Sequence, residues 1–442
     1  MSEELQHSSR RTAKSPAIAR HGRLKRSSTW KSIAKIAGAM LGVVLVSGSA
    51  VGAYAAWDLA NSFKPGVTLG NEELLEGVPD LGAFPGGVNV LIIGSDSREG
   101  QGDGFGDPDE ETAVLNDVTM LFHIAEDHSH ASVISFPRDM LVDVPACDDP
   151  EAPGEQLWEQ YGVKINSVLD YGGMPCVVKT VSQLVGVEIP FAGVVQFMGV
   201  ASLSEAVGGV EVCVAEPIED VHTDLFLEAG MHELKGLQAL QFLRTRHGVG
   251  DGSDLGRISN QQVFLSALAR TLQSNGTLTD PGKLYGIAKA ALDNMQLSDS
   301  LTNPTTMISM ALALKDIDLA AIQFIQYPTS NNGAGAQVPT SSADVVNLAL
   351  QQDIPVAFDQ EAQQEVSFGS TVEPTAPVEE APPVEEAPVE EAPPADEAPA
   401  VEAGGEAPPA EPTPQVEPLP SDVYGQTAAE QRCSAGRTLD DQ

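Results

Sequence analysis

Residues 88–98 read VNVLIIGSDSR, an apolar run that ends in an acid and a base. A short continuous apolar run, here Val88–Ile93, is typical of a strand buried on both faces of a sheet. Two similar runs follow at Val118–Ile124 and Ser132–Phe136. These three runs predict a central sheet, and the segments around them indicate what covers it.

Helical periodicity follows the strands. Apolar residues recur every three to four positions in five stretches: Cys176–Leu184, Val195–Val207, Leu234–Leu243, Ile258–Leu272 and Pro281–Leu297. Because strands and helices are interspersed, we expect an α/β or α+β layered fold. Of these we predict an α/β fold with a central mixed β-sheet flanked by helices. Residues 63–361 are enough for one large core and form the expected single domain. The apolar run 186–214 is interpreted as core or, alternatively, as the wall of an apolar groove for a lipid tail.

The N-terminal region predicts a membrane anchor. Residues 1–35 hold nine of the 24 Lys and Arg but only two of the 63 Asp and Glu. Residues 36–57 (IAGAMLGVVLVSGSAVGAYAAW) are uncharged, and about 20 apolar residues span a bilayer. Because positive charge stays inside, we expect a cytoplasmic N-terminal tail, one transmembrane helix in the cell membrane and an extracytoplasmic catalytic domain. A cleaved signal peptide is the alternative.

The C-terminal region divides into two parts. Residues 371–420 repeat Pro, Glu and Ala, a composition that predicts a disordered segment, interpreted as a spacer, a repulsive brush or a tolerated extension. Residues 421–442 carry the last of four cysteines. An even number fits an oxidising compartment. We expect Cys147 to pair with Cys176, and Cys213 with Cys433.

A second informative stretch, residues 240–262, reads LQFLRTRHGVGDGSDLGRISNQQ. It gathers three arginines in a chain whose net charge is −39. Arg244 and Arg246 would share a face if that part were a strand. Arg257 and Gln261, four residues apart, would share a helix face. Guanidinium groups beside a helix N-terminus favour phosphate or pyrophosphate.

Charged residues also lie where the predicted strands begin and end. Asp96 and Arg98 follow the first strand, Asp117 precedes the second, and Arg138-Asp139 follows the third. Two carboxylates near arginines suit a magnesium ion that bridges Asp96, Asp117 and phosphate oxygens. Taken singly, Asp96 also fits a turn, Asp117 a strand cap and Arg138-Asp139 a structural ion pair.

Together these motifs resemble the LytR-CpsA-Psr family of extracytoplasmic cell-wall enzymes, in particular its actinobacterial members. The resemblance covers residues 87–272. The matching stretches are NVLIIGSDSR (89–98), NDVTMLFHI (116–124), SFPRDMLVDVP (135–145), KINSVLDYGG (164–173), FMGVASLSEAVGGVEV (197–212), LEAGMHELKGLQALQFLRTRHG (227–248) and DLGRISNQQ (254–262).

The resemblance implies a hydrophobic polyprenyl pocket and a defined reaction. A glycan 1-phosphate would move from a polyprenyl-pyrophosphate carrier to a peptidoglycan hydroxyl, with Mg²⁺ as cofactor. Asp96 and Asp117 match the metal-associated positions, and Asp117, Arg138 and Arg257 are the expected catalytic residues. The pyrophosphate-binding set comprises Arg98, Arg138, Lys164, Arg244, Arg246, Arg257 and Gln261.

Two positions depart from the family pattern. Many relatives carry arginine where this chain has Leu115, and often where it has Asn260, so the local positive charge is lower here. A polyprenyl-pyrophosphate hydrolase and a non-catalytic wall-associated binding or regulatory protein are the alternative functions. Nucleic acid is not an expected partner, because duplex affinity comes mainly from basic residues that neutralise phosphates and the exported part is acidic.

Overall fold

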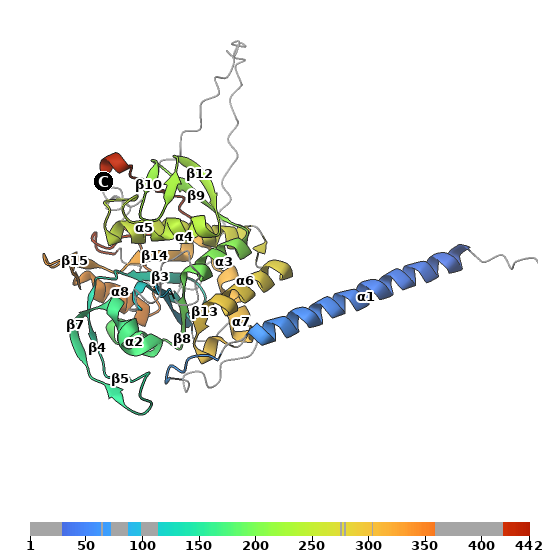
Figure 1. Ribbon diagram of the computed structural model, residues 1–442, viewed down its shortest axis with the longest axis horizontal. Helices are drawn as coiled ribbons and strands as arrows, with labels where there is room; N and C mark the ends of the chain where they lie inside the picture. Colours follow the sequence, from blue (N-terminus) through green and yellow to red (C-terminus); the bar gives the residue numbers. More distant parts are fainter. Residues whose placement is uncertain are drawn as a thin grey trace, which may run out of the picture. The chain divides into compact units, whose positions relative to one another are not determined.

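A seven-stranded mixed sheet forms the centre of the folded unit, Leu59–Gln442 (Figure 1). The strands, in spatial order, are β13 (Met295–Leu297), β8 (Phe191–Val195), β1 (Val88–Ser95), β2 (Asn116–Ile124), β3 (Ala131–Phe136), β14 (Ile322–Gln326) and β17 (Gly425–Thr427). The pairs β1–β8 and β3–β14 are parallel, and the remaining pairs are antiparallel. This arrangement confirms the predicted α/β fold and its mixed sheet.

The computed structural model describes residues 29–62, 65–71, 87–98, 114–274, 276–277, 280–302, 304–358 and 419–442. The predicted basic tail lies almost wholly outside these residues, and so does nearly all of the predicted disordered segment.

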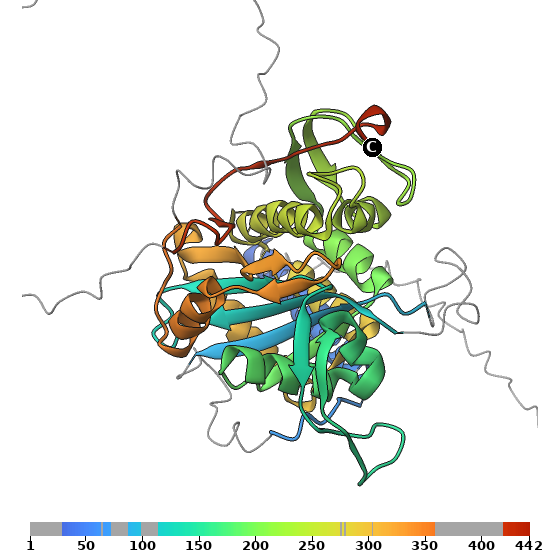
Figure 2. The same cartoon turned by 90° about the vertical axis from the view of Figure 1, so that its left-hand side faces the viewer.

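Two hydrophobic cores lie on opposite faces of the sheet, because successive side chains of a strand point to opposite faces. Leu91 and Ile93 of β1 enter one core, while Val88 and Val90 enter the other. Figure 2 shows helices above and below the strands. The first core is covered by α2 (Val168–Val185) and α8 (Ser342–Gln351), the second by α5 (Asp254–Ser274), α6 (Pro281–Asn294) and α7 (Pro304–Lys315).

A smaller β-layer packs on the outer side of α5 and forms a third core with it. This layer contains the helix α4 (Leu237–Arg244) and the strands β9 (Val210–Val214), β10 (Ile218–Asp220), β11 (Leu225–Leu227), β12 (Gly230–Leu234) and β18 (Cys433–Ser434). The helix α3 (Phe197–Val207) connects it to the sheet. As a result α5 is enclosed on two sides, and six consecutive residues from Ile258 to Val263 are buried.

Three predicted helices extended too far, because a buried strand and a buried helix look alike in apolar content. Val195 ends β8 and Leu234 ends β12, so each following helix begins later than predicted. At Met295 the backbone turns extended (φ −122°, ψ 150°), and residues 295–297 form the edge strand β13. Arg244 and Arg246 do not share a strand face, because Arg244 ends the helix α4.

Short strands complete the fold beside α2 and at the end of β14. They are β4 (Leu141–Val144), β5 (Cys147–Asp148), β6 (Gln156–Leu157), β7 (Gln160–Lys164), β15 (Thr329–Asn331) and β16 (Gln337–Pro339). β4 pairs with β7, so the chain returns to the charged residues at the end of β3.

Residues 419–442, here called the C-terminal strap, belong to the folded unit. The Leu419 amide donates to the Ala357 carbonyl at 2.8 Å, β17 extends the central sheet, and β18 pairs with β9. Arg270 of α5 donates to two carbonyl oxygens of the strap. Both predicted disulfides are confirmed, Cys147–Cys176 and Cys213–Cys433. The domain was expected to comprise residues 63–361, and the strap adds the strands β17 and β18 to it.

The helix α1 (Thr29–Ser62) belongs to the N-terminal unit, Met1–Asp58, except for its last four residues. Its segment Ile33–Tyr54 has a mean hydropathy of 1.9 and is long enough to cross a bilayer. The helix overlaps the predicted transmembrane residues 36–57. One apolar helix near the N-terminus is consistent with a single membrane span or with a signal sequence.

Candidate functional site

An apolar cavity of about 540 Å³ lies between the sheet and the helices α3 to α6. Its wall is formed chiefly by Ile92, Val118, Met120, Phe197, Val200, Leu203, Val207, Leu240, Phe264, Leu265, Leu268, Leu272 and Ile287. Several of these residues come from the apolar run 186–214. That run therefore supplies both core and cavity wall, as its two interpretations allowed.

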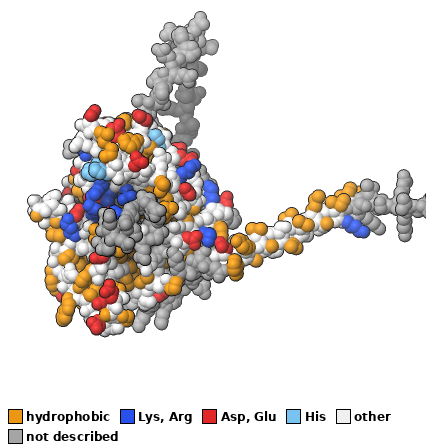
Figure 3. All heavy atoms as spheres, viewed as in Figure 1, with side chains coloured by type: hydrophobic (Ala, Val, Ile, Leu, Met, Phe, Trp, Pro, Cys, Tyr) orange, Lys and Arg blue, Asp and Glu red, His pale blue; other side chains and the backbone are white. Residues whose placement is uncertain are grey.

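The polar residues that line the same cavity come largely from one group of elements. Asp117 comes from β2, Arg244 from the end of α4, Arg246 from the loop that follows α4, and Arg257 and Gln261 from the first turns of α5. The structure thus brings five of the predicted site residues to one cavity. Figure 3 shows Lys and Arg side chains gathered in one place on the surface, with histidines beside them.

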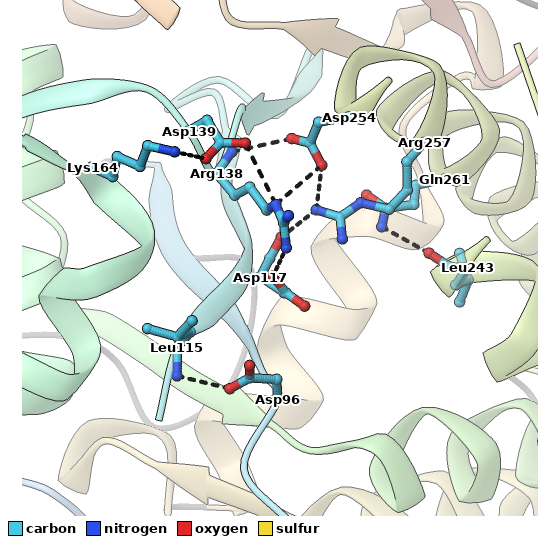
Figure 4. A network of polar contacts seen from close by, with 10 residues as sticks. All are labelled: Asp96, Leu115, Asp117, Arg138, Asp139, Lys164, Leu243, Asp254, Arg257 and Gln261. Carbon is cyan, nitrogen blue, oxygen red and sulfur yellow. Dashed lines mark hydrogen bonds and ion pairs between the residues drawn. The ribbon is translucent and has the colours of Figure 1, made fainter. Parts of the chain in front are cut away.

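Asp117, Arg138, Asp254 and Arg257 form one network (Figure 4). Arg138 donates Nη1 to Asp117 Oδ1 at 2.6 Å. Arg257 donates Nη2 to the Asp117 carbonyl at 2.6 Å, and the same nitrogen lies 2.7 Å from Asp254 Oδ1. These bonds fix both guanidinium planes against β2. Their Nε atoms are buried and have no hydrogen-bond partner among the described residues.

The two arginines differ in their electrostatics. Burial lowers the pKa of Arg257, opposed by the charges of Asp254 and Asp117 and reinforced by those of Arg138 and Arg246. At Arg138 burial also lowers the pKa, but the hydrogen bond and charge of Asp117, together with the charges of Asp254 and Asp139, outweigh it, so the pKa is raised. Several close positive charges in a poorly hydrated place favour an anionic ligand.

Arg244 lies over a ring at the cavity wall. Its Cζ is 4.1 Å from the centroid of the Phe197 ring, a cation–π contact. Burial lowers the pKa of Arg244; the charges of Asp117 and Asp96 oppose this, and those of Arg98 and Arg257 add to it. Arg244 is therefore electrostatically coupled to both predicted metal-associated aspartates and to Arg98.

Lys164 and Asp96 lie at the margin of the network. Lys164 donates Nζ to Asp139 Oδ1 at 2.5 Å, and Asp139 Oδ2 is 3.7 Å from Arg138 Nε. The carboxylate of Asp96 accepts from the Leu115 amide at 2.7 Å. None of Asp96, Arg98, Arg138 and Lys164 lines the cavity itself.

The two departures from the family pattern differ in their structural roles. The main chain of Leu115 bonds to Asp96, since its amide donates to the Asp96 carboxylate and its carbonyl accepts from the Asp96 amide, whereas Asn260 acts through its side chain. Asn260 donates to the Phe242 carbonyl at 2.6 Å and accepts from the Ser434 hydroxyl of the C-terminal strap. Gln261 donates to the Leu243 carbonyl at 3.0 Å. The start of α5 is therefore bound to the end of α4 and to the strap.

The two predicted metal-associated carboxylates, Asp96 and Asp117, differ in how their oxygens are occupied. Among the described residues no cluster of three or more His, Cys, Asp or Glu side chains is placed to hold a metal. Mg²⁺ commonly uses one or two carboxylates, with waters and substrate phosphates completing its shell. Arg138 occupies Oδ1 of Asp117, and Oδ2 accepts no hydrogen bond from the described residues. Asp117 therefore has an oxygen that could bind such an ion, while Asp96 already accepts from the Leu115 amide.

Sequence reasoning missed several residues at the cavity. His222 and His247 both line it, and their ring centroids are 4.5 Å apart. Buried Asp220 accepts from Thr245 Oγ1 at 2.5 Å and fixes the loop between Arg244 and Arg246. His247 follows Arg246 directly, which could have indicated it, whereas residues 220–223 carry no comparable pattern.

Comparison with known proteins supports the family given by these motifs. The profile of the LytR_cpsA_psr family matches residues 78–352, more than half of the chain. The chain belongs to the LytR-CpsA-Psr family.

Individual relatives are more distant. The cell wall biosynthesis protein LcpA of Corynebacterium glutamicum is 30% identical over 301 residues, 61% of this chain and 56% of LcpA. TagT of Bacillus subtilis, a polyisoprenyl-teichoic acid–peptidoglycan teichoic acid transferase, is 26% identical over 314 residues, 69% of this chain and 88% of TagT. The chain spans about half the length of LcpA and of the related LcpB.

Among solved structures, the LytR-Csp2A-Psr enzyme from Actinomyces oris gives a TM-score of 0.45 at 19% identity. The match covers 62% of this chain and 91% of that chain.

Proposed function

We propose that this protein transfers a glycan 1-phosphate from a polyprenyl-pyrophosphate carrier to a hydroxyl of peptidoglycan. The observation that carries the proposal is the apolar cavity whose lining includes Arg244, Arg246 and Arg257. A polyprenyl pyrophosphate has the complementary form, a long apolar chain with a doubly anionic head. The name of the relative TagT, which describes transfer from a polyisoprenyl carrier to peptidoglycan, supports the same class of reaction.

The arginines would bind the pyrophosphate and neutralise charge as the transfer proceeds. The acceptor oxygen attacks the phosphorus that carries the glycan, the bond from that phosphorus to the bridging oxygen breaks, and polyprenyl phosphate leaves. Phosphoryl transfer depends mainly on positioning and charge stabilisation. Asp254 and the Asp117 carbonyl hold Arg257 in place, so its charge is fixed before substrate binds.

Asp117 would accept the proton of the acceptor hydroxyl. Its Oδ1 is held by Arg138, so Oδ2 is the oxygen that remains for the proton or for a metal ion. Asp96 and Asp117 would also hold Mg²⁺, which when bound supplies additional positive charge to the phosphate oxygens. Arg98 and Lys164 would contribute to pyrophosphate binding from the margin of the network.

We further propose that α1 anchors the protein in the cell membrane as a single span with its N-terminus in the cytoplasm. The excess of Lys and Arg in residues 1–35 supports this orientation. The site would then face the outside, where peptidoglycan is the acceptor and the lipid bilayer supplies the carrier.

The test uses full-length protein in detergent micelles with a polyprenyl-pyrophosphate donor labelled in its glycan. With Mg²⁺ and isolated peptidoglycan, we expect label to enter the peptidoglycan, and chelation of the metal to stop transfer. Arg257→Ala should reduce transfer by about 10²-fold or more. Lys235→Ala, a change of an exposed lysine, is the matched control and should leave transfer unchanged.

Two outcomes would overturn the proposal. Release of free glycan phosphate at the same rate without peptidoglycan would identify a hydrolase. Tight donor binding without turnover under any of these conditions would identify a binding or regulatory protein.

A further inference from the structure

The two most exposed large hydrophobic side chains in the described part of the folded unit lie together on one hairpin. Trp158 is 86% exposed and Tyr161 is 72% exposed. Both belong to residues 147–164, here called the aromatic hairpin, which contains β5, β6 and β7. Aromatic side chains of this size normally bury much of their surface. Apolar surface left exposed in this way indicates a binding function.

The backbone of the aromatic hairpin is held in place at several points. The Cys147–Cys176 disulfide fixes its first strand to α2. Tyr171 of α2 donates its hydroxyl to the Trp158 carbonyl at 2.6 Å. The Gly162 amide donates to Asp143 Oδ1 at 3.0 Å, beside Tyr161. The aromatic residues are therefore presented on a fixed backbone, which reduces the entropy lost when a ligand binds.

The charge around the two rings restricts the ligand. From Asp143 to Val163 the chain carries six carboxylates and no Lys or Arg. This surface would repel anionic lipid headgroups, nucleic acid and phosphate-rich polymers. Carboxylates accept hydrogen bonds from hydroxyl and amide groups. An uncharged polyhydroxylated ligand with apolar faces, a sugar chain, fits both features.

Aromatic rings also match the shape of sugars. One face of a pyranose ring presents C–H bonds, whose partial positive charge favours the negative face of an aromatic ring. Tyr161 donates its hydroxyl to the Glu159 carboxylate, which restrains that side chain. Trp158 and Tyr161 are three residues apart and can contact neighbouring parts of one extended chain.

The hairpin leads directly to the candidate active site. β7 runs from Gln160 to Lys164, and Lys164 forms an ion pair with Asp139, the neighbour of Arg138. At about 3.3 Å per residue, Tyr161 and Lys164 are roughly 10 Å apart along the strand. A glycan bound on the hairpin and long enough to follow β7 would thus extend toward Lys164 and the arginine network.

We propose that Trp158 and Tyr161 form a platform that binds the uncharged sugar rings of the acceptor glycan strand. The role of this platform in binding the acceptor rests on the proposed transferase function. The platform places the acceptor beside the site while the donor occupies the cavity, so it determines acceptor affinity and not donor affinity.

The first experiment uses Trp158 as its own reporter. The chain has three tryptophans, so the full-length protein with Trp30→Phe and Trp57→Phe retains only Trp158. We expect a saturable change in its fluorescence on titration with an N-acetylglucosamine hexamer. Phosphatidylglycerol vesicles should leave the emission unchanged. A blue shift with vesicles and none with the sugar would overturn the proposal in favour of membrane contact.

The second experiment separates the platform from the catalytic site. Trp158→Ala should weaken retention on isolated peptidoglycan about tenfold and raise the KM for peptidoglycan, with kcat and donor affinity unchanged. Phe226→Ala, a change of a 53% exposed aromatic residue in the small β-layer, is the matched control. An unchanged melting temperature shows that the variants are folded.

The outcomes distinguish the two proposals. If wild-type protein transfers glycan and Trp158→Ala has the same KM and retention, the platform is wrong and the transferase stands. If wild-type protein binds sugar through Trp158 but does not transfer glycan, the transferase is wrong and the platform stands as a wall-binding site.

Discussion

Loss of the Cys213–Cys433 disulfide should destabilise the folded unit more than loss of Cys147–Cys176. The perturbations are two double substitutions, Cys213→Ser with Cys433→Ser and Cys147→Ser with Cys176→Ser. The first bridge spans 220 residues and the second 29. In the chain-entropy description a bridge stabilises mainly by restricting the unfolded chain, and the effect grows with the logarithm of the loop length.

The structure sets the magnitudes. A loop of 220 residues corresponds to about 5.4 kcal/mol at 25 °C, and one of 29 residues to about 3.6 kcal/mol. The expected difference is therefore about 2 kcal/mol in the free energy of unfolding. The first pair also joins β9 to the C-terminal strap, whose Ser434 bonds to Asn260 near the site.

The assay is guanidinium unfolding of residues 59–442, followed by far-ultraviolet circular dichroism, with wild type and both variants under identical conditions. Hydrogen exchange at Gly425–Thr427 reports whether the strap detaches before the remaining sheet unfolds. An equal or larger loss for the Cys147–Cys176 variant would refute the loop-length argument. Early exchange confined to residues 425–427 would then identify the strap as a separable appendage.

Three further predictions concern the cavity, the network and pH. Asp117→Asn should lower the rate of glycan transfer about 10²-fold, because it weakens the ion pair with Arg138 and removes the proposed base. The affinity for the donor, measured in parallel, should be retained. Leu203→Trp should fill the cavity and weaken binding of long prenyl pyrophosphates more than short ones, as competition with prenyl chains of graded length would show. Burial and the neighbouring His123 lower the pKa of His130 below its ordinary 6.5. As the pH drops, the unfolded chain therefore binds a proton at this histidine before the folded protein does. The free energy of unfolding should fall as the pH drops from 7 through about 6, and it should fall less steeply in His130→Phe.

The sequence predicted the sheet well, because its strands are buried on both faces and read as unbroken apolar runs. β1, β2 and β3 all lie where such runs occur. Short strands escaped notice for the opposite reason. β13 and β17 have three residues each and gain their structure from the strands they pair with, β8 and β14. Tertiary pairing, which local pattern does not encode, decides their conformation.

The candidate site was predictable at its charged residues and not at its neutral ones. Arg244, Arg246 and Arg257 stand out because cations are rare in this chain, and the structure places all three at one cavity. Phe197 looks like any core residue in the sequence, and only its position beneath Arg244 shows its contribution. The mutual support of Asn260 and Ser434 joins residues 174 positions apart and has no local signature.

The hydrogen bond between Leu419 and Ala357 bears on the acidic, proline-rich stretch between them. Residues 358 and 419, on either side of this stretch, both belong to the folded unit, so the strap is attached to the domain by contacts other than the chain between them. These contacts are the pairing of β17 with β14, the pairing of β18 with β9 and the Cys213–Cys433 disulfide. A protease that cut between residues 359 and 418 would therefore leave two polypeptides that remain covalently joined through this disulfide and separate only after reduction.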